Sequence, residues 1–301
     1  MALRHDNDII MAEGTNQTFP VLTMVDGLPC KPYYKGAIRD CRGFHRGQRK
    51  LLVGEIFFLT QALSSIKTKK PIAVIYIGAS PGNHIPVLTT FFTDLIFECY
   101  DPMPFIFNST EKIRIHQEFF TDELAKKYSM AKDLTLLLIS DVRSTDLAEP
   151  DDATVMKNQA DQLRWCQIIK PIQAWLKFRI PFNTENYRYL AGVSHFQAWA
   201  PPESAEIRML AKRKSTMEYH LMREYPVKYH EQVCCYINTQ IRGKRNIIDG
   251  ICQCYDCRLE QIVLKIYADK YDKSSDFISR IGEYFDDVLG DRHTKLRHER
   301  G

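Results

Sequence analysis

Two lysines and two carboxylic acids are the side chains of this 301-residue sequence best suited to chemistry. Lys177 is a lone lysine among apolar neighbours, and Lys50 adjoins the apolar face of an expected helix. Asp141 follows one apolar run, and Glu206 begins another. A lysine becomes a base near neutral pH when burial and a second cation lower its pKa from about 10.4, and neighbouring carboxylates can orient its amine.

These four residues suit the transfer of a methyl group to a hydroxyl. The attack on a sulfonium donor must be in line, and the hydroxyl proton must leave because a neutral alcohol is a poor nucleophile. We expect Lys177 to take that proton and Lys50 to lower the pKa of Lys177. Asp141 and Glu206 would orient the amines and share their charge. A single buried lysine is more often ion-paired or extended toward solvent, so this interpretation requires all four side chains to meet.

Residues 74–85 predict where a donor would bind. Residues 71–77 are almost wholly apolar and β-branched, as in a central parallel strand, and Gly78 and Gly82 then open a turn into a helix. The spacing of these glycines is not that of a dinucleotide fingerprint, and no Gly-Lys-Ser/Thr follows, which disfavours NAD and a P-loop. S-adenosylmethionine fits better, with Asp101 ending the second strand and holding the ribose hydroxyls. An ordinary strand–helix connection is the alternative.

The rest of the chain alternates strands and helices, which predicts a doubly wound, mostly parallel α/β sheet with helices on both faces. In such a fold, ligand-binding side chains follow the carboxyl ends of strands, which places Asp141 and Arg143 beside the glycine turn. We expect helices at residues 46–65, 83–95, 122–131, 151–172, 233–241, 253–270 and 277–289, and strands at 71–77, 96–100, 112–119, 134–140 and 173–179, with later strands within 187–199 and 206–212. The expected organisation is a loose arm (1–35), a core (36–222), a helical layer of the same domain (223–290) and a disordered basic tail (291–301).

Composition narrows the class of protein. No apolar run approaches the roughly 20 residues that cross a bilayer, and the N-terminus lacks the apolar centre of a signal peptide, so we expect a cytoplasmic protein. An odd number of cysteines, nine, indicates reduced thiols. Five of them are clustered and could bind zinc, but their spacing lacks paired Cys-x-x-Cys motifs, which favours free thiols: Cys234, Cys235, Cys252, Cys254 and Cys257.

Four short basic clusters are separated by folded-looking sequence, at residues 67–70, 211–214, 242–245 and 292–297. Each cluster alone is more often a solvated face. Together they could converge into a surface that follows the phosphates of a nucleic acid. The formal net charge of +4 permits a polyanionic partner but does not require one.

Five stretches carry a family resemblance in chain order: GQRKLLVGEIFFL (47–59), VIYIGASPGNHI (74–85), LISDVRS (138–144), KPIQAWLKFRIPF (170–182) and SAEIRML (204–210). They resemble the cap-specific ribose 2′-O-methyltransferases of poxviruses, which also serve as small regulatory subunits of the viral poly(A) polymerase. The resemblance implies a Rossmann-like class I methyltransferase of a large DNA virus, whose catalytic tetrad is Lys50, Asp141, Lys177 and Glu206. It implies S-adenosyl-L-methionine as cofactor, held by Gln48, Leu51, Tyr76, Gly78, Pro81, Gly82, His84, Asp101, Asp141 and Arg143.

The resemblance also implies a cap pocket, in which aromatic rings enclose the cationic methylated guanine and carboxylates accept its N–H groups. Phe182 matches one ring, Tyr33 or Tyr34 lies near the place of the other, and Glu231 matches a guanine-binding acid. Two departures affect selectivity for the methylated base. Asn183 and Thr184 stand where the family has a second acid, and Glu203 replaces an aromatic residue, with Trp199 as a substitute ring.

The leading hypothesis is a metal-independent enzyme that methylates the ribose 2′-oxygen of the first transcribed nucleotide of m7G-capped mRNA. Its implied partners are that mRNA and the catalytic subunit of a viral poly(A) polymerase, and its implied location is the viral factory of the host cytoplasm, and the virion. A second hypothesis is an RNA-binding processivity subunit with secondary or lost catalysis, which the intact tetrad disfavours. A third is a ribosomal or transfer RNA 2′-O-methyltransferase, which would not need Phe182 and Glu231.

Overall fold

The structure is a computed structural model. It describes residues 9–11, 18–20, 23–24, 26–33, 46–144, 150–201, 204–213, 219, 221–242, 247–248, 251–252, 254–274 and 276–289. Tyr34, Pro202, Glu203 and the predicted tail at 291–301 lie outside these ranges.

A seven-stranded sheet forms the centre of the molecule, in the order β5-β4-β3-β6-β7-β10-β9. The first five of these strands are parallel to one another, and β10 is antiparallel to both of its neighbours. The prediction of a doubly wound, mostly parallel sheet is confirmed. The strands are β3 (Ile72–Ile77), β4 (Leu95–Tyr100), β5 (Ile113–His116), β6 (Thr135–Ser140), β7 (Gln173–Phe178), β9 (Val193–His195) and β10 (Ile207–Lys212).

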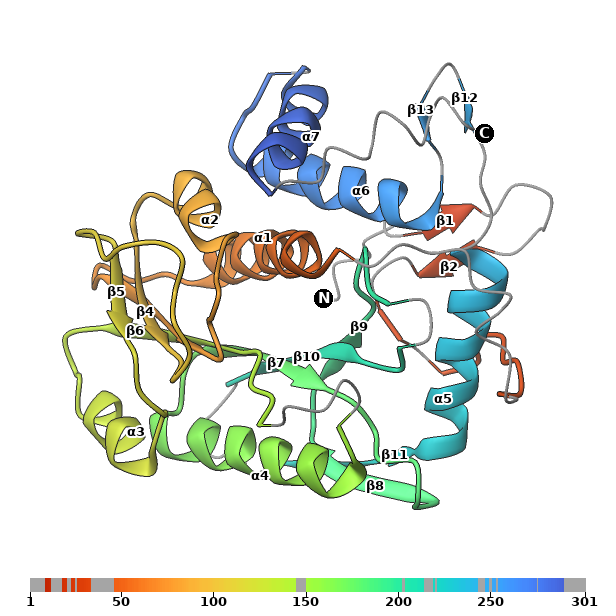
Figure 1. Ribbon diagram of the computed structural model, residues 1–301, viewed down its shortest axis with the longest axis horizontal. Coiled ribbons are helices and arrows are strands. Elements are labelled where there is room, and N and C mark those ends of the chain that lie inside the picture. Colours follow the sequence, from red (N-terminus) through yellow and green to blue (C-terminus); the bar gives the residue numbers. More distant parts are fainter. Residues whose placement is uncertain are drawn as a thin grey trace.

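Helices cover both faces of this sheet (Figure 1). Helices α1 (Gly47–Ser65) and α2 (Ile85–Phe91) lie on one face, and α3 (Asp122–Ser129) and α4 (Asp152–Ile169) lie on the other. Helix α6 (Tyr255–Lys270) packs against α1, and α7 (Phe277–Val288) packs against α6. The remaining helix, α5 (Val227–Tyr236), continues into the π-helix η3 (Ile237–Ile241). No helix in the described ranges is long and apolar enough to span a membrane.

The core strands match their predicted ranges closely because their side chains are buried on both faces. Every residue of β6 is buried, and five of the six residues of β3 are. Helix ends differ more from the predictions. Helix α4 stops at Ile169, before Lys170 adopts a left-handed conformation with φ +54° and Pro171 follows. Helix α2 starts only at Ile85, because Gly82 in the preceding turn has a non-helical φ of +73°.

Short strands lie outside the main sheet. Residues 187–199, expected to supply later strands, divide into β8 (Asn186–Leu190) and β9, and β8 pairs with β11 (Met222–Pro226), which was not predicted. Part of the expected N-terminal arm is also ordered into strands, as β1 (Ile9–Met11) pairs with β2 (Thr18–Pro20). Thr23 then bridges to His195 of β9. The last pair is β12 (Ile247–Ile248) with β13 (Ile251–Cys252).

Candidate active site

The four predicted catalytic residues meet at the carboxyl edge of the parallel strands. Asp141 directly follows β6, Lys177 is the penultimate residue of β7, and Glu206 directly precedes the antiparallel β10. Because β6, β7 and β10 are neighbours in the sheet, these three residues converge. Lys50 reaches them from the first turn of α1, with 3.1 Å between its Nζ and Glu206 Oε1. The sequence therefore identified four residues that the fold brings together.

Lys177 is held between the two carboxylates. Its Nζ lies 3.1 Å from Asp141 Oδ1 and 3.8 Å from Glu206 Oε2, and it donates a hydrogen bond to the carbonyl oxygen of Asp141 at 3.2 Å. Only 12% of the side chain is exposed. Burial lowers the pKa of Lys177, the carboxylates oppose that effect, and the cations Lys50 and Arg143 lower the pKa further. The uncharged amine is thus more accessible at neutral pH than in a free lysine.

The two carboxylates remain ionised. Burial opposes ionisation of Asp141, but Lys177, Arg208 and Lys50 hold its pKa at about 2. Desolvation opposes ionisation of Glu206 too, yet the surrounding cations hold its pKa well below the usual range. Arg143, a predicted cofactor residue, contributes to this by donating to Glu206 Oε2 at 2.7 Å. The two carboxylates therefore act as hydrogen-bond acceptors that position the lysine amines. Because they stay ionised, they do not compete with Lys177 for a proton.

Arg208 is a part of the site that the sequence did not reveal. It is 1% exposed, and its guanidinium donates to the Asp141 carboxylate, to Ser140 O at 3.2 Å and to Gln197 Oε1 at 2.8 Å. It lies two positions after Glu206, and alternate residues of a strand point to the same face. A lone arginine within the apolar run 207–211 was the signal available in the sequence.

The glycine turn lies directly beside this cluster. Gly78 has φ +77°, and a Cβ there would lie 2.7 Å from Val142 N and 2.8 Å from Asp141 C. Gly82 has φ +73°, and a Cβ there would lie 2.7 Å from Ala79 O. Both positions therefore exclude other side chains. The turn after β3 and the end of β6 are therefore in close contact, and the end of β6 carries Asp141, which contacts Lys177.

Asp101 joins the glycine turn to the loop after β4. Its carboxylate accepts hydrogen bonds from Ser80 N at 3.2 Å and Met103 N at 2.9 Å. Ser80 belongs to the glycine turn and Met103 to the loop after β4, so Asp101 connects the two segments. Pro81, in the same turn, is exposed. This is the place at which the acid was expected, at the end of the second strand.

Three other predicted cofactor residues form a buried network beneath the turn. Gln48 Oε1 lies 2.7 Å from His84 Nδ1, His84 Nε2 lies 3.1 Å from Glu55 Oε2, and the Tyr76 hydroxyl donates to Glu55 Oε1 at 2.5 Å. Tyr76 and His84 are fully buried, and Leu51 is also buried. The structure therefore buries Tyr76 and His84 against Gln48 and Glu55 of α1, which holds the start of α2 against α1.

Two predicted cap-binding aromatics are exposed. Phe182 is 45% exposed, its backbone N–H donates to Asp152 Oδ2 at 2.7 Å, and the Arg179 guanidinium lies 4.6 Å from its ring centroid. Tyr33 is 48% exposed and follows Lys31, whose N–H donates to the carbonyl of Gln232 on α5. Glu231 lies on the same helix, and burial raises its pKa.

Trp199 is not available as the second ring. It is 2% exposed, its Nε1 donates to Glu260 Oε2 at 2.6 Å, and the guanidinium groups of Arg46 and Arg49 lie 4.7 and 5.2 Å from its ring centroid. The side chain belongs to a buried contact between α1, α6 and the loop before β10. Its selection as a substitute cap residue was wrong, because its indole is enclosed by the helical layer.

The clustered cysteines show no metal site in the described ranges. Cys234 and Cys235 are buried free thiols, and the side chain of Cys252 lies outside the described residues. No group of three potential metal ligands occurs among the residues described. Burial raises the pKa of the Cys234 thiol to about 12, which disfavours the thiolate.

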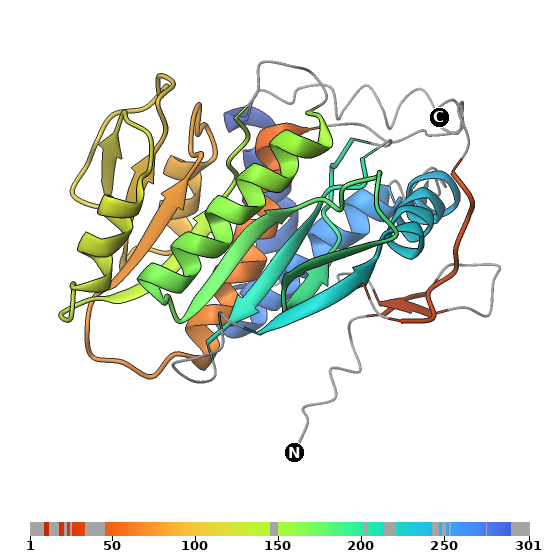
Figure 2. The ribbon, with the colours of Figure 1, turned by 90° about the horizontal axis from the view of Figure 1, so that it is seen from below.

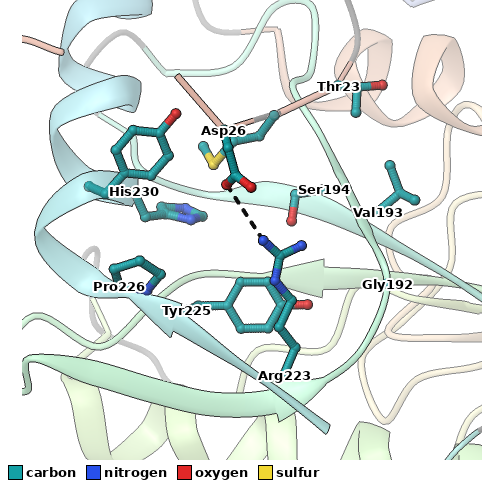
Figure 3. Close-up of a pocket in the computed structure, with 11 residues that line it drawn as sticks. Thr23, Asp26, Gly192, Val193, Ser194, Arg223, Tyr225, Pro226 and His230 are labelled. Atoms are coloured by element: carbon teal, nitrogen blue, oxygen red, sulfur yellow. Dashed lines mark ion pairs between the residues drawn. The ribbon is translucent and has the colours of Figure 1, made fainter. Parts of the chain in front are cut away.

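A separate pocket of about 320 Å³ lies between the N-terminal segment, β9, β11 and α5 (Figure 3). Arg223 points toward Asp26, and 3.6 Å separates the guanidinium from the carboxylate. None of the predicted site residues lines this pocket, and we assign it no role in catalysis. The lining residues are Thr23, Met24, Asp26, Gly192, Val193, Ser194, Arg223, Tyr225, Pro226, Tyr229 and His230.

The sheet order and the lysine–carboxylate cluster at its carboxyl edge define a Rossmann-like methyltransferase. Residues 22–278 match the family described as the poly A polymerase regulatory subunit. The chain belongs to this family.

Poxvirus proteins are among its relatives. The cap-specific mRNA (nucleoside-2'-O-)-methyltransferase of fowlpox virus (strain NVSL) is 32% identical over 215 residues, covering 66% of this chain and 68% of that protein. The protein of the same name from myxoma virus (strain Lausanne) is 28% identical over 215 residues, and the match spans 66% of this chain but 62% of the relative. The capping protein VP4 of bluetongue virus shares 16% identity at a TM-score of 0.45, covering 70% of this chain and 35% of that one.

Proposed function

We propose that this chain transfers a methyl group from S-adenosyl-L-methionine to the ribose 2′-oxygen of the first transcribed nucleotide of m7G-capped mRNA. The observation that carries the proposal is the partly buried Lys177, whose amine lies between Asp141 and Glu206 beside the glycine turn. The names of the fowlpox and myxoma relatives support the same reaction and substrate.

In the proposed mechanism, Lys177 Nζ takes the proton of the 2′-hydroxyl. Its lowered pKa makes the uncharged amine available, and its hydrogen bond to Asp141 O directs the amine. The ribose O–H bond breaks, and the oxygen attacks in line. Bound S-adenosylmethionine supplies an electrophilic methyl group, so that a C–O bond forms as the C–S bond breaks and a neutral thioether leaves.

The surrounding residues would prepare this step. Lys50 and Arg143 disfavour the charged form of Lys177, and Arg208 keeps the Asp141 carboxylate in place. Gly78 and Gly82 allow the backbone to approach the donor, and Asp101 is suited to accept hydrogen bonds from ribose hydroxyls.

Recognition of the cap would use Phe182, Glu231 and either Tyr33 or Tyr34. A methylated guanine is cationic, and it stacks on aromatic rings more strongly than the neutral base. Arg179 lies over the Phe182 ring here, so we expect a bound guanine to displace that guanidinium. Because Asn183 stands where the family has an acid, we expect weaker discrimination against unmethylated guanine.

Comparison of three RNA substrates tests this function. Labelled methyl transfer is measured to m7G-capped RNA, to RNA capped with unmethylated guanine, and to uncapped RNA of the same sequence. We expect the m7G-capped RNA to have the highest kcat/KM, and Phe182→Ala to reduce this preference. Equal transfer to capped and uncapped RNA would instead indicate a ribosomal or transfer RNA methyltransferase.

We also propose a second role as the regulatory subunit of a poly(A) polymerase in the cytoplasm of infected cells. The match of residues 22–278 to the family of that description supports it. The test is the length of poly(A) that a viral polymerase catalytic subunit adds to an RNA primer with and without this chain. Unchanged tail length and no complex on size-exclusion chromatography would contradict this second role.

A further inference from the structure

We propose that the sheet edge opposite the active site binds the phosphate backbone of single-stranded RNA. Seven exposed cations form this edge, which we call the basal surface: Lys67, Lys69, Lys70, Lys132, Lys170, Lys212 and Arg213. They include two of the basic clusters noted in the sequence, 67–70 and the described part of 211–214. The inference is independent of the proposed methyl transfer.

The topology explains why cations from distant parts of the sequence converge here. The segments that contain Lys67, Lys132 and Lys170 precede β3, β6 and β7, so they lie at the amino ends of adjacent parallel strands. Strand β10 is antiparallel to β7, and its last residue, Lys212, pairs with the first residue of β7, Gln173. Figure 2 shows the segment before β3 (orange), the starts of β6 and β7 and the end of β10 along the lower edge of the sheet.

Hydrogen bonds to the backbone fix the segments relative to one another. Lys70 Nζ donates to Lys132 O at 2.6 Å, which joins the segments before β3 and β6. Arg213 Nη1 donates to Lys170 O at 3.0 Å, and Arg213 N donates to Ile172 O at 2.8 Å. The segments that carry these cations are therefore held next to one another at the sheet edge.

The charge of the basal surface is largely uncompensated. Within the described part of the chain, none of the seven cations forms an ion pair. Asp94 and Asp133 are exposed at the same edge and leave five net positive charges there, one more than the +4 of the whole chain. Such an array attracts a polyanion, because each neutralised phosphate releases condensed counterions.

The residue types favour RNA over a protein partner. Six of the seven cations are lysines, and lysine is depleted at protein–protein interfaces. Lysine and arginine contacts to phosphates position a nucleic acid without reading its sequence. The six-residue strands separate this surface from the active site by roughly 20 Å at about 3.3 Å per residue. A short capped oligonucleotide in the active site would therefore not reach the basal surface, whereas a long RNA would.

The test compares two triple variants with equal loss of charge. The basal variant is Lys67→Gln, Lys69→Gln and Lys212→Gln, and the control is Lys157→Gln, Lys228→Gln and Lys265→Gln, on α4, α5 and α6. All six lysines are exposed. Fluorescence anisotropy measures the affinity for an uncapped RNA of about 40 nucleotides over a series of salt concentrations, and melting temperatures verify folding.

We expect the slope of log K against log salt to fall by about 2 in the basal variant, because each lost phosphate contact removes about 0.7. We expect the control to keep the wild-type slope, and both variants to methylate a capped RNA of about six nucleotides at the wild-type rate. An equal decrease of this slope in both variants, or no decrease in either variant, would overturn the proposal. Unchanged RNA affinity with lost binding of a polymerase subunit would also overturn it and assign the surface to a protein.

Discussion

At the scale of single residues, the environment of Lys177 determines the chemistry. Its amine is largely removed from solvent, with two carboxylates in contact and two further cations nearby. Burial favours the uncharged amine, and the carboxylates limit that effect. The balance gives a lysine whose pKa lies below that of a free lysine.

The pH dependence of the rate tests this balance. The rate of methyl transfer should rise with pH as Lys177 loses its proton. The apparent pKa of this rise should lie below the pKa of a free lysine. Removing the nearby cation in Lys50→Met should raise the pKa of Lys177 and move the profile to higher pH. The measurement is the single-turnover rate against pH for both proteins. A profile that does not move, or that moves to lower pH, would contradict the role of Lys50.

Arg208 is predicted to stabilise the site and the fold together. Arg208→Met removes the arginine partner of Asp141 while Lys177 remains 3.1 Å away, so we expect a loss of about 1.5–3 kcal/mol in unfolding free energy. The matched control is Arg114→Met. Arg114 forms an ion pair with Glu98, but its side chain is 56% exposed, so we expect its loss to cost at most about 1 kcal/mol. Urea denaturation measures both. Equal costs for the two variants would refute the structural role of Arg208.

The sequence was informative about residues whose type is unusual for their surroundings. Lys177 and Lys50 stood out because charges are rare in apolar segments. Arg208 had the same property and was missed, because its role depends on contacts with Asp141 and Gln197 that only the fold creates. Trp199 was misassigned because nothing in the sequence shows that α6 would cover it.

At the scale of elements, the turn after β3 is the most constrained part of the site. Its backbone at Gly78 is in direct contact with the end of β6. Asp101 accepts a hydrogen bond from Ser80 N in this turn, and we propose that the turn and Asp101 form the cradle for the donor.

A pair of glycine substitutions tests this constraint. Gly78→Ala must adopt φ +77° with a Cβ 2.7 Å from Val142 N, so we expect a loss of about 1–3 kcal/mol of stability and weaker donor binding. Gly282→Ala, in α7, meets no atom within 4 Å and should raise stability by up to about 1 kcal/mol. Thermal unfolding and calorimetric titration with S-adenosylmethionine measure these effects. A Gly78→Ala protein that binds the donor like wild type would contradict the proposed cradle.

Buried elements were predicted from the sequence more accurately than exposed ones. Strands β3, β4, β6 and β7 were placed to within about a residue, because long apolar runs leave few alternatives. Strand β11 was missed because it pairs only with β8, outside the main sheet, and most of its residues are not buried. Helix ends depended on local backbone conformation, such as the left-handed Lys170.

At the scale of the whole molecule, the helical layer after residue 223 completes the core. Glu260 of α6 accepts two hydrogen bonds from Arg49 of α1 at 2.7 Å and one from Trp199. These contacts connect α6 to the helix that carries Lys50. The sequence indicated a helical layer, but the partners of Glu260 come from distant segments and could not be predicted.

The two edges of the sheet therefore have different chemistry. The carboxyl edge contains the tetrad and the glycine turn, and the opposite edge contains the basal surface. In this proposal, an RNA long enough to contact both edges would be bound at two places, at the active site and at the basal surface.

The most direct test of the central claim is the rate of methyl transfer by Lys177→Met at saturating S-adenosylmethionine and m7G-capped RNA, with Lys265→Met as the surface control. We expect at least a roughly 100-fold lower kcat, in the range that general bases contribute, with donor affinity unchanged. The control should keep the wild-type kcat. A Lys177→Met protein within about threefold of the wild-type rate would show that this amine does not carry the reaction.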